Sequence, residues 1–221
     1  MTESLESFLS SLERRALLAT SLPEASDDLI TAQGGVPLGR PGELWPEHDG
    51  RPLFPILSVR TSELPFVPSV FEHDAYLVIF IKKDEYEVAT NDGSLVLRRY
   101  PDMAELVPLA VPPGAETTRL PLGFKEIRDF PEPSVISEAL EDRPELLEAY
   151  EQESDKWESA FPCADGIKIG GYPLLIQETA FLKSLDPDFA IQLDGTDLYS
   201  YGDSGVGYVD ADLSYILWES F

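Results

Sequence analysis

The sequence has a single cysteine, Cys163, and only two histidines, His48 and His73. One cysteine excludes an intramolecular disulfide and any metal site built from several cysteines. We interpret Cys163 as a buried bystander thiol, because neither histidine belongs to a motif that would pair it with a catalytic cysteine. Both histidines stand beside acidic residues without a recognisable third ligand, so we expect structural or surface roles for them and no metal.

Basic residues are also scarce. The chain has 16 lysines and arginines against 41 aspartates and glutamates, a formal net charge of −25. Such a charge repels nucleic acid and anionic membranes, and it accelerates encounter with a basic partner. Nucleic-acid binding is therefore the first function that the composition excludes. Solubility alone is the alternative explanation of the acidity.

Long apolar runs are missing as well. No run approaches the ~18 residues of a membrane span, and Met1 to Ser4 lack the basic start of a secretory signal. We therefore expect a cytoplasmic protein without a membrane segment. The 221 residues, 43% of them hydrophobic, suffice for one large domain with a substantial core.

The N-terminal residues 1–22 are predicted to form an amphipathic helix. Apolar side chains recur at helical spacing between Glu3 and Leu18, and Pro23 follows the pattern. We treat residues 23–221 as the remaining domain.

Short apolar segments separated by proline and glycine predict that this domain is rich in strands. Residues 54–59 and 76–81 are expected strands, and the second is apolar enough to be covered on both faces. Asn91-Asp92-Gly93 is typical of a hairpin turn, here between residues 86–88 and 95–97.

The middle of the chain, residues 101–165, is first proline-rich and then helical. Residues 107–113 and 120–124 are expected edge strands or extended crossings. From Asp142 a capping residue, an early proline and an apolar stripe predict a helix over residues 142–158. The remaining positions of this helix are acidic, and we interpret them as a solvated face.

The two ends of the chain share a pattern. Gly34-Gly35-Val36-Pro37 precedes an apolar strand segment by ~20 residues, and Gly170-Gly171-Tyr172-Pro173 does the same. The half-repeats would span residues 29–100 and 166–221, linked by residues 101–165. We predict an α+β, β-rich single unit with an N-terminal helix and an acidic helix between the halves, and we keep internal duplication as a hypothesis.

Three motifs suggest chemistry, and each has a plainer explanation. Gly202-Asp203-Ser204-Gly205 has the letters around a trypsin-like nucleophile, but neither histidine stands in the matching motif, and a tight turn explains it. The aspartates from Asp186 onward fail the calcium-loop template, whose third oxygen would fall on Ala190. The glycine pairs lack the helix that follows a phosphate-binding loop. We therefore predict no catalytic residue, no metal and no cofactor.

Several segments carry a family resemblance: 169–177, 189–194 and 202–208 near the C-terminus, and 34–37, 45–46 and 50–53 near the N-terminus. From about Leu29 to its end the chain resembles the YwqG-like family, a bacterial group catalogued as a domain of unknown function. The resemblance implies an α+β, strand-rich fold and no known reaction. A glutamine usual in the first strand is replaced around residues 55–57, and a histidine usual before the second glycine pair is absent, with Lys168 nearby.

The resemblance also implies a function. Members of this kind occur among genes for secreted bacterial toxins, including those of type VI secretion, where small acidic proteins serve as immunity factors. We therefore predict a non-catalytic immunity protein that blocks a basic cognate toxin. From Ser184 to the C-terminus there is no lysine or arginine, so we place the partner-binding surface at Asp194, Asp197, Tyr199, Tyr201, Asp203, Asp210 and Asp212.

A second function class stays open. The protein would then be a small-ligand-binding protein or an enzyme with a pocket between the half-repeats. Its polar contacts would be Gln177, Gln192 and Asp194.

Overall fold

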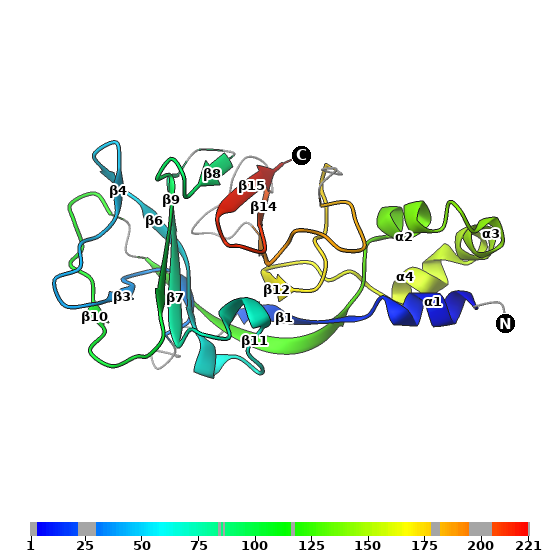
Figure 1. Ribbon diagram of the computed structural model, residues 1–221, viewed down its shortest axis with the longest axis horizontal. Coiled ribbons are helices and arrows are strands. Elements are labelled where there is room, and N and C mark those ends of the chain that lie inside the picture. The colour runs from blue at the N-terminus through cyan, green and yellow to red at the C-terminus, as the bar shows by residue number, and fades with distance from the viewer. Residues whose placement is uncertain are drawn as a thin grey trace.

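The computed structural model describes residues 4–21, 30–83, 85, 87–115, 118–177, 182–194 and 205–220 (Figure 1). This part of the chain holds four α-helices, two short 3-10 helices and fifteen strands, which makes the fold α+β and rich in strands, as predicted. The short helices are η1 (Thr61–Glu63) and η2 (Ser69–Phe71).

Most strands belong to one antiparallel sheet of eleven strands. Its order from edge to edge is β8 (Glu87–Ala89), β15 (Tyr215–Glu219), β14 (Val206–Val209), β13 (Ile191–Asp194), β12 (Lys168–Gly170), β1 (Arg14–Ser21), β11 (Arg119–Asp129), β2 (Ala32–Gly34), β6 (Phe54–Arg60), β7 (Tyr76–Ile81) and β9 (Leu95–Tyr100). Two small sheets pair β3 (Leu38–Gly39) with β10 (Val107–Pro108) and β4 (Glu47–His48) with β5 (Arg51–Pro52).

The sheet is organised around β1, which pairs with β11 on one side and with β12 on the other. The prediction of a helix over residues 1–22 is therefore wrong in extent: α1 covers only Leu5–Ser11, and the strand begins at Arg14. Ala16 and Leu17 are fully buried between the neighbouring strands. Two long-range ladders of hydrogen bonds outweigh the helical spacing of this segment, so the N-terminus is not separable from the sheet.

Four helices gather at one end of the molecule, beyond the ends of β1 and β11 (Figure 1): α1, α2 (Pro133–Ala139), α3 (Pro144–Gln152) and α4 (Ser154–Ala160). Ser4 caps α1 by accepting the Ser7 N–H, whereas α2 and α3 begin with a proline. The predicted helix over residues 142–158 is two helices, α3 and α4, separated at Glu153. An apolar cluster holds this helical end together, with Leu9, Leu140 and Tyr150 among its buried members.

The predicted hairpin around Asn91-Asp92-Gly93 is also corrected. The turn exists, but β8 pairs with β15 and β9 pairs with β7, so the turn joins the two opposite edges of the sheet. Ser94 connects the edges, because its Oγ accepts the Ala89 N–H at 2.9 Å and its carbonyl accepts the Lys82 N–H at 2.7 Å. The sheet is thereby curved nearly into a barrel.

The long strand β11 differs from the edge strand predicted at residues 120–124, because it lies in the middle of the sheet. Pro121 has no N–H to donate, yet it is accommodated. β1 pairs with β11 only from Leu122 onward, and β2 pairs with it only at Arg119–Pro121, so Pro121 faces a neighbour on one side.

Two series of strands extend outward from the central pair, in the orders β2-β6-β7-β9 and β12-β13-β14-β15. Both begin with a strand that ends in a glycine pair, and Gly34, Gly35, Gly170 and Gly171 all have φ between 62° and 76°. The predicted strands at residues 54–59 and 76–81 are confirmed as β6 and β7, and every residue of β7 is buried. The largest apolar cluster draws buried side chains from both series.

Candidate functional site

The loop that follows β12, here called the glycine–proline loop, runs from Gly171 to Gln177 without a strand partner. Its N–H groups are instead bound by side chains from the sheet and from the start of α2. The acceptors are Asp129 for Tyr172, Gln192 for Leu174, Glu132 for Leu175 and Glu219 for Ile176 and Gln177, at 2.8–3.1 Å. The glycine–proline loop is therefore held to the sheet by side-chain hydrogen bonds and has a structural role.

A fully buried ion pair lies beneath this loop. Lys168 Nζ stands 2.9 Å from Asp129 Oδ2, and neither side chain is exposed. Lys168 also donates to the Ala164 carbonyl at 2.8 Å, while Asp129 Oδ1 accepts the Ala164 N–H at 2.7 Å. Each charge meets the other and a backbone group of Ala164, so the pair fixes the backbone at this position.

Cys163 borders this pair, with its Sγ 3.8 Å from Lys168 Nζ. Burial raises the pKa of the Cys163 thiol to about 12, although the neighbouring ammonium group acts in the opposite direction. A thiol that stays protonated near neutral pH is a poor nucleophile. The geometry supports the interpretation of Cys163 as a bystander.

The three residues predicted for a ligand pocket have different surroundings. Gln192 is fully buried, and its Nε2 donates to the Gly166 carbonyl at 2.9 Å while its Oε1 binds the glycine–proline loop. Gln177 is exposed and donates to the Ser220 carbonyl. Asp194 lies half-buried at the end of β13. Both ends of the Gln192 amide therefore bond backbone groups, which gives this residue a structural role.

The predicted partner-binding residues are only partly within the described chain. Asp197, Tyr199, Tyr201 and Asp203 lie outside the described residues, as do Gly202 and Ser204 of the serine motif. Asp194 pairs with Val206 at one end of β14, whereas Asp210 follows its other end. Asp210 and the exposed Asp212 share the turn into β15, so the structure brings these two together and separates them from Asp194.

Asp210 has a structural role in that turn. Its carboxylate accepts the Ser214 N–H and hydroxyl at 2.6 Å each and the Tyr215 N–H at 3.0 Å. Asp188 accepts the Ala211 N–H at 3.1 Å, which connects the turn to the segment before β13. Leu185 of that segment packs against the helical end. The C-terminal turn and the helices are therefore structurally linked.

The helical end presents the densest group of carboxylates in the described chain. All the acidic side chains of α3, α4 and the turn before them are exposed, and two basic residues, Arg143 and Lys156, accompany them. We call this group the acidic helical face: Glu141, Asp142, Glu145, Glu148, Glu151, Glu153, Asp155 and Glu158. Half-buried Leu147 and Trp157 belong to the same two helices.

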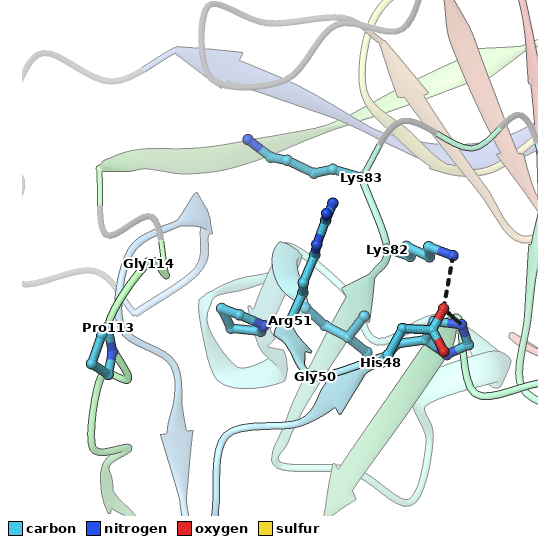
Figure 2. Close-up of a pocket in the computed structure, with 10 residues that line it drawn as sticks. His48, Gly50, Arg51, Lys82, Lys83, Pro113 and Gly114 are labelled. Atoms are coloured by element: carbon cyan, nitrogen blue, oxygen red, sulfur yellow. Dashed lines mark hydrogen bonds and ion pairs between the residues drawn. The ribbon is translucent and has the colours of Figure 1, made fainter.

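A cleft of about 650 Å³ opens at the other end of the molecule (Figure 2). Its walls are the β4–β5 hairpin, the chain just after β7, and the turn at Pro113 and Gly114. We call it the cationic cleft, because its lining includes Arg51, Lys82 and Lys83 as well as His48. The sequence pattern does not reveal this cleft, because its cations come from separate segments whose local signals are only those of turns and strand ends.

A smaller cavity of about 210 Å³ lies beside the first glycine pair, lined among others by Gly34, Pro37 and Tyr76. The Tyr76 hydroxyl accepts the Leu38 N–H there at 3.1 Å. Burial raises the pKa of Tyr76, which keeps this hydroxyl protonated.

A search against protein-family models finds no matching family, and a search of the curated proteins finds no significant match. Within the residues that the structure describes, no group of three or more His, Cys, Asp or Glu is placed to hold a metal ion. None of the helices in these ranges has the length and apolar character needed to cross a membrane.

Proposed function

We propose that this protein is a non-catalytic binding protein that holds a basic protein partner on an acidic surface. The observation that carries the proposal is the acidic helical face, where exposed carboxylates lie on the same helices as Leu147 and Trp157. Carboxylates accelerate the approach of a basic partner, and packed aromatic or aliphatic side chains slow its release.

The acidic helical face is also preorganised. Tyr150 of α3 is buried in the apolar cluster that joins α3 to α1, and Phe161, just after α4, packs on Phe130 with ring centroids 4.9 Å apart. A surface fixed in this way loses little conformational entropy when a partner binds.

As the partner we propose a cognate bacterial toxin, so that the protein acts as a cytoplasmic immunity protein. This step draws on the resemblance to the YwqG-like family and on the net charge of −25. The mechanism would be steric and electrostatic: the acidic face would cover the basic surface with which a nuclease-like toxin meets its substrate.

We further propose that the two strand series arose by duplication. Both series pair in the same order, and in both a strand tyrosine bonds to the backbone of the leucine that follows the glycine–proline motif. Tyr76 accepts the Leu38 N–H at 3.1 Å, and Tyr208 donates to the Leu174 carbonyl at 2.8 Å.

Co-expression with the product of a neighbouring gene tests the proposed function. We expect growth to be restored in cells that produce a toxic neighbour, and the purified complex to weaken as salt is raised. Glu148→Lys combined with Glu151→Lys should weaken the complex by about tenfold or more, because it reverses two charges at the centre of the acidic helical face.

Glu47→Lys combined with Glu72→Lys is the matched control. It makes the same change of net charge on exposed residues outside the helical end and should leave most of the affinity. Equal losses in both double variants would show that overall charge, not this face, governs binding. Absence of a toxic neighbour and of any salt-sensitive complex would overturn the immunity function itself.

A further inference from the structure

The cationic cleft is built on rigid backbone. Asp49 and Gly50 form the turn between β4 and β5 with φ of 51° and 70°, the positive values that a tight two-residue hairpin requires. The hairpin is fixed from below, because the Trp45 Nε1–H donates to the Leu53 carbonyl at 2.8 Å and the Leu53 N–H donates to the Pro46 carbonyl at 2.9 Å. Arg51 is therefore presented from a fixed position.

The two sides of the cleft differ in charge. On one side Lys82 Nζ lies 2.6 Å from Glu85 and 3.4 Å from Asp49, and His48 Nε2 lies 3.2 Å from the same Asp49 carboxylate. The charge of Lys82 is therefore balanced by carboxylates. The pKa of Lys82 is raised, mainly by its hydrogen bond with Glu85, so Lys82 stays positively charged.

On the other side Arg51 lacks such a carboxylate among the described residues. Figure 2 shows Arg51 projecting toward Lys83, whereas Lys82 turns away toward Asp49. The Arg51 side chain is exposed and makes no ion pair or hydrogen bond with any other residue that the structure describes. Lys83 Nζ stands 4.3 Å from the centre of the Phe54 ring, which holds its stem along the wall of the cleft.

The charge of the cleft lining is opposite in sign to the net charge of the chain. Acidic residues outnumber basic ones by more than two to one, yet the lining of this cleft has three cations and one carboxylate, Asp49. At physiological salt the charges of the rest of the protein are screened beyond ~8 Å. An anion inside the cleft would therefore respond mainly to the charges that line it, among which Arg51 has no carboxylate partner in the described chain.

We propose that the cationic cleft binds a small organic ligand through its phosphate or carboxylate groups. The planar fork of Arg51 suits the paired oxygens of either group, and Lys83 supplies a second charge from the facing segment. The volume of about 650 Å³ is within the usual range of small-ligand sites. Pro52 and Pro113 add apolar surface for the rest of the ligand. This site goes beyond the proposed partner-binding function and lies on a different part of the molecule.

Titration of the full chain with pyrophosphate and, separately, with citrate tests the site. The readout is the NMR shift of the Gly50 and Gly114 amides, with chloride at matched ionic strength as the reference. We expect saturable shifts with at least one of the two anions. A response to pyrophosphate alone assigns a phosphate-bearing ligand, and a response to citrate alone assigns a carboxylate-bearing one.

Arg51→Gln should weaken the binding of that anion by about tenfold, the usual size of one charge-assisted hydrogen bond. Lys83→Gln should weaken it by about threefold. The matched control is Lys125→Gln, which removes one charge from an exposed residue of β11 outside the cleft. Its affinity should stay within about twofold of the parent protein.

Two results would overturn the proposal. One is the absence of saturable shifts with either anion at low millimolar concentration. The other is an equal loss of affinity in Arg51→Gln and Lys125→Gln, which would mean that the anions sense only the total charge. Arg51 is exposed and unpaired, so its substitution should leave the circular dichroism of the protein unchanged.

Discussion

The two strand series of the sheet cover their faces by different means. In the series β2-β6-β7-β9 both faces of β7 are apolar: Leu77, Ile79 and Ile81 belong to the largest cluster, whereas Tyr76, Val78 and Phe80 belong to a second cluster around Trp45. In the series β12-β13-β14-β15 one face belongs to the largest cluster as well. Its other face carries a row of paired neighbours with polar groups, Lys168, Gln192 and Tyr208.

The two kinds of covering differ in how well they tolerate a substitution. Apolar clusters stabilise in proportion to buried area and tolerate change of shape within limits. Gln192 and Tyr208 of the polar row instead fix the glycine–proline loop by individual hydrogen bonds, each of modest net value while it is intact. Loss of a single partner leaves buried groups unpaired. The second series should therefore be the more brittle one.

The sharpest test is Asp129→Ala. It leaves the buried Lys168 ammonium without its carboxylate and removes the acceptor of two backbone N–H groups. We expect the free energy of unfolding, measured with urea, to fall by about 3–5 kcal/mol. Glu126→Ala on the same strand breaks the exposed ion pair with Arg15 and should cost less than about 1 kcal/mol. Similar losses in both variants would contradict the role of the buried pair.

Leu77→Ala measures the apolar series. The side chain is fully buried in the largest cluster, and its truncation should lower the free energy of unfolding by about 3 kcal/mol through lost burial and a residual cavity. Leu44→Ala is the control, because Leu44 is 79% exposed and should change stability by no more than about 0.5 kcal/mol. A loss under about 1 kcal/mol at Leu77 would show that this part of the core repacks.

The fold could be predicted from the sequence only where local pattern suffices. β7 is a continuous apolar run bounded by turn residues, so its extent and its burial follow from residues 76–81 themselves. Arg14 to Leu18 fit a helix and a strand equally well, and the decision comes from β11 and β12, far away in the chain. The turn at Asn91-Asp92-Gly93 is locally correct, but its flanking strands find better partners at opposite edges.

The sites were harder to predict for the same reason. Gln192 was predicted as a polar contact of a pocket between the half-repeats. In the structure it accepts the Leu174 N–H of the glycine–proline loop, which follows the neighbouring strand β12. Arg51 and Lys83 line the same cleft because β6 pairs with β7, Phe54 opposite Ile81, so that the residues just before β6 and just after β7 lie at the same end of the two strands. The acidic helical face was visible in the sequence, since its carboxylates are consecutive on α3 and α4, but only the packing of those helices shows that it is rigid.

A matched pair of hydroxyl deletions compares the two series directly. The Tyr208 hydroxyl donates to the Leu174 carbonyl at 2.8 Å and accepts the Ile176 N–H at 3.2 Å, whereas the Tyr76 hydroxyl accepts the Leu38 N–H at 3.1 Å. Tyr208→Phe should cost about 2 kcal/mol in thermal or urea unfolding and Tyr76→Phe about 1 kcal/mol. The reverse order would mean that the glycine–proline loop does not depend on Tyr208.

The smallest expected effect is the dependence of stability on alkaline pH. Burial raises the pKa of Tyr150 and of Tyr215 to about 12, and it raises that of Tyr208 further, whereas unfolded tyrosines titrate near ~10. Because the folded state keeps protons that the unfolded state releases, the contribution of these groups is complete below about pH 10 and is lost as pH rises through the folded values. Urea midpoints measured across this range should fall, and they should fall less steeply in Tyr208→Phe, which lacks one of the titrating groups.

Tyr76→Phe provides the comparison from the apolar series, since burial raises the pKa of Tyr76 as well. Parallel curves for both variants and the parent protein would show that neither hydroxyl contributes to the alkaline transition.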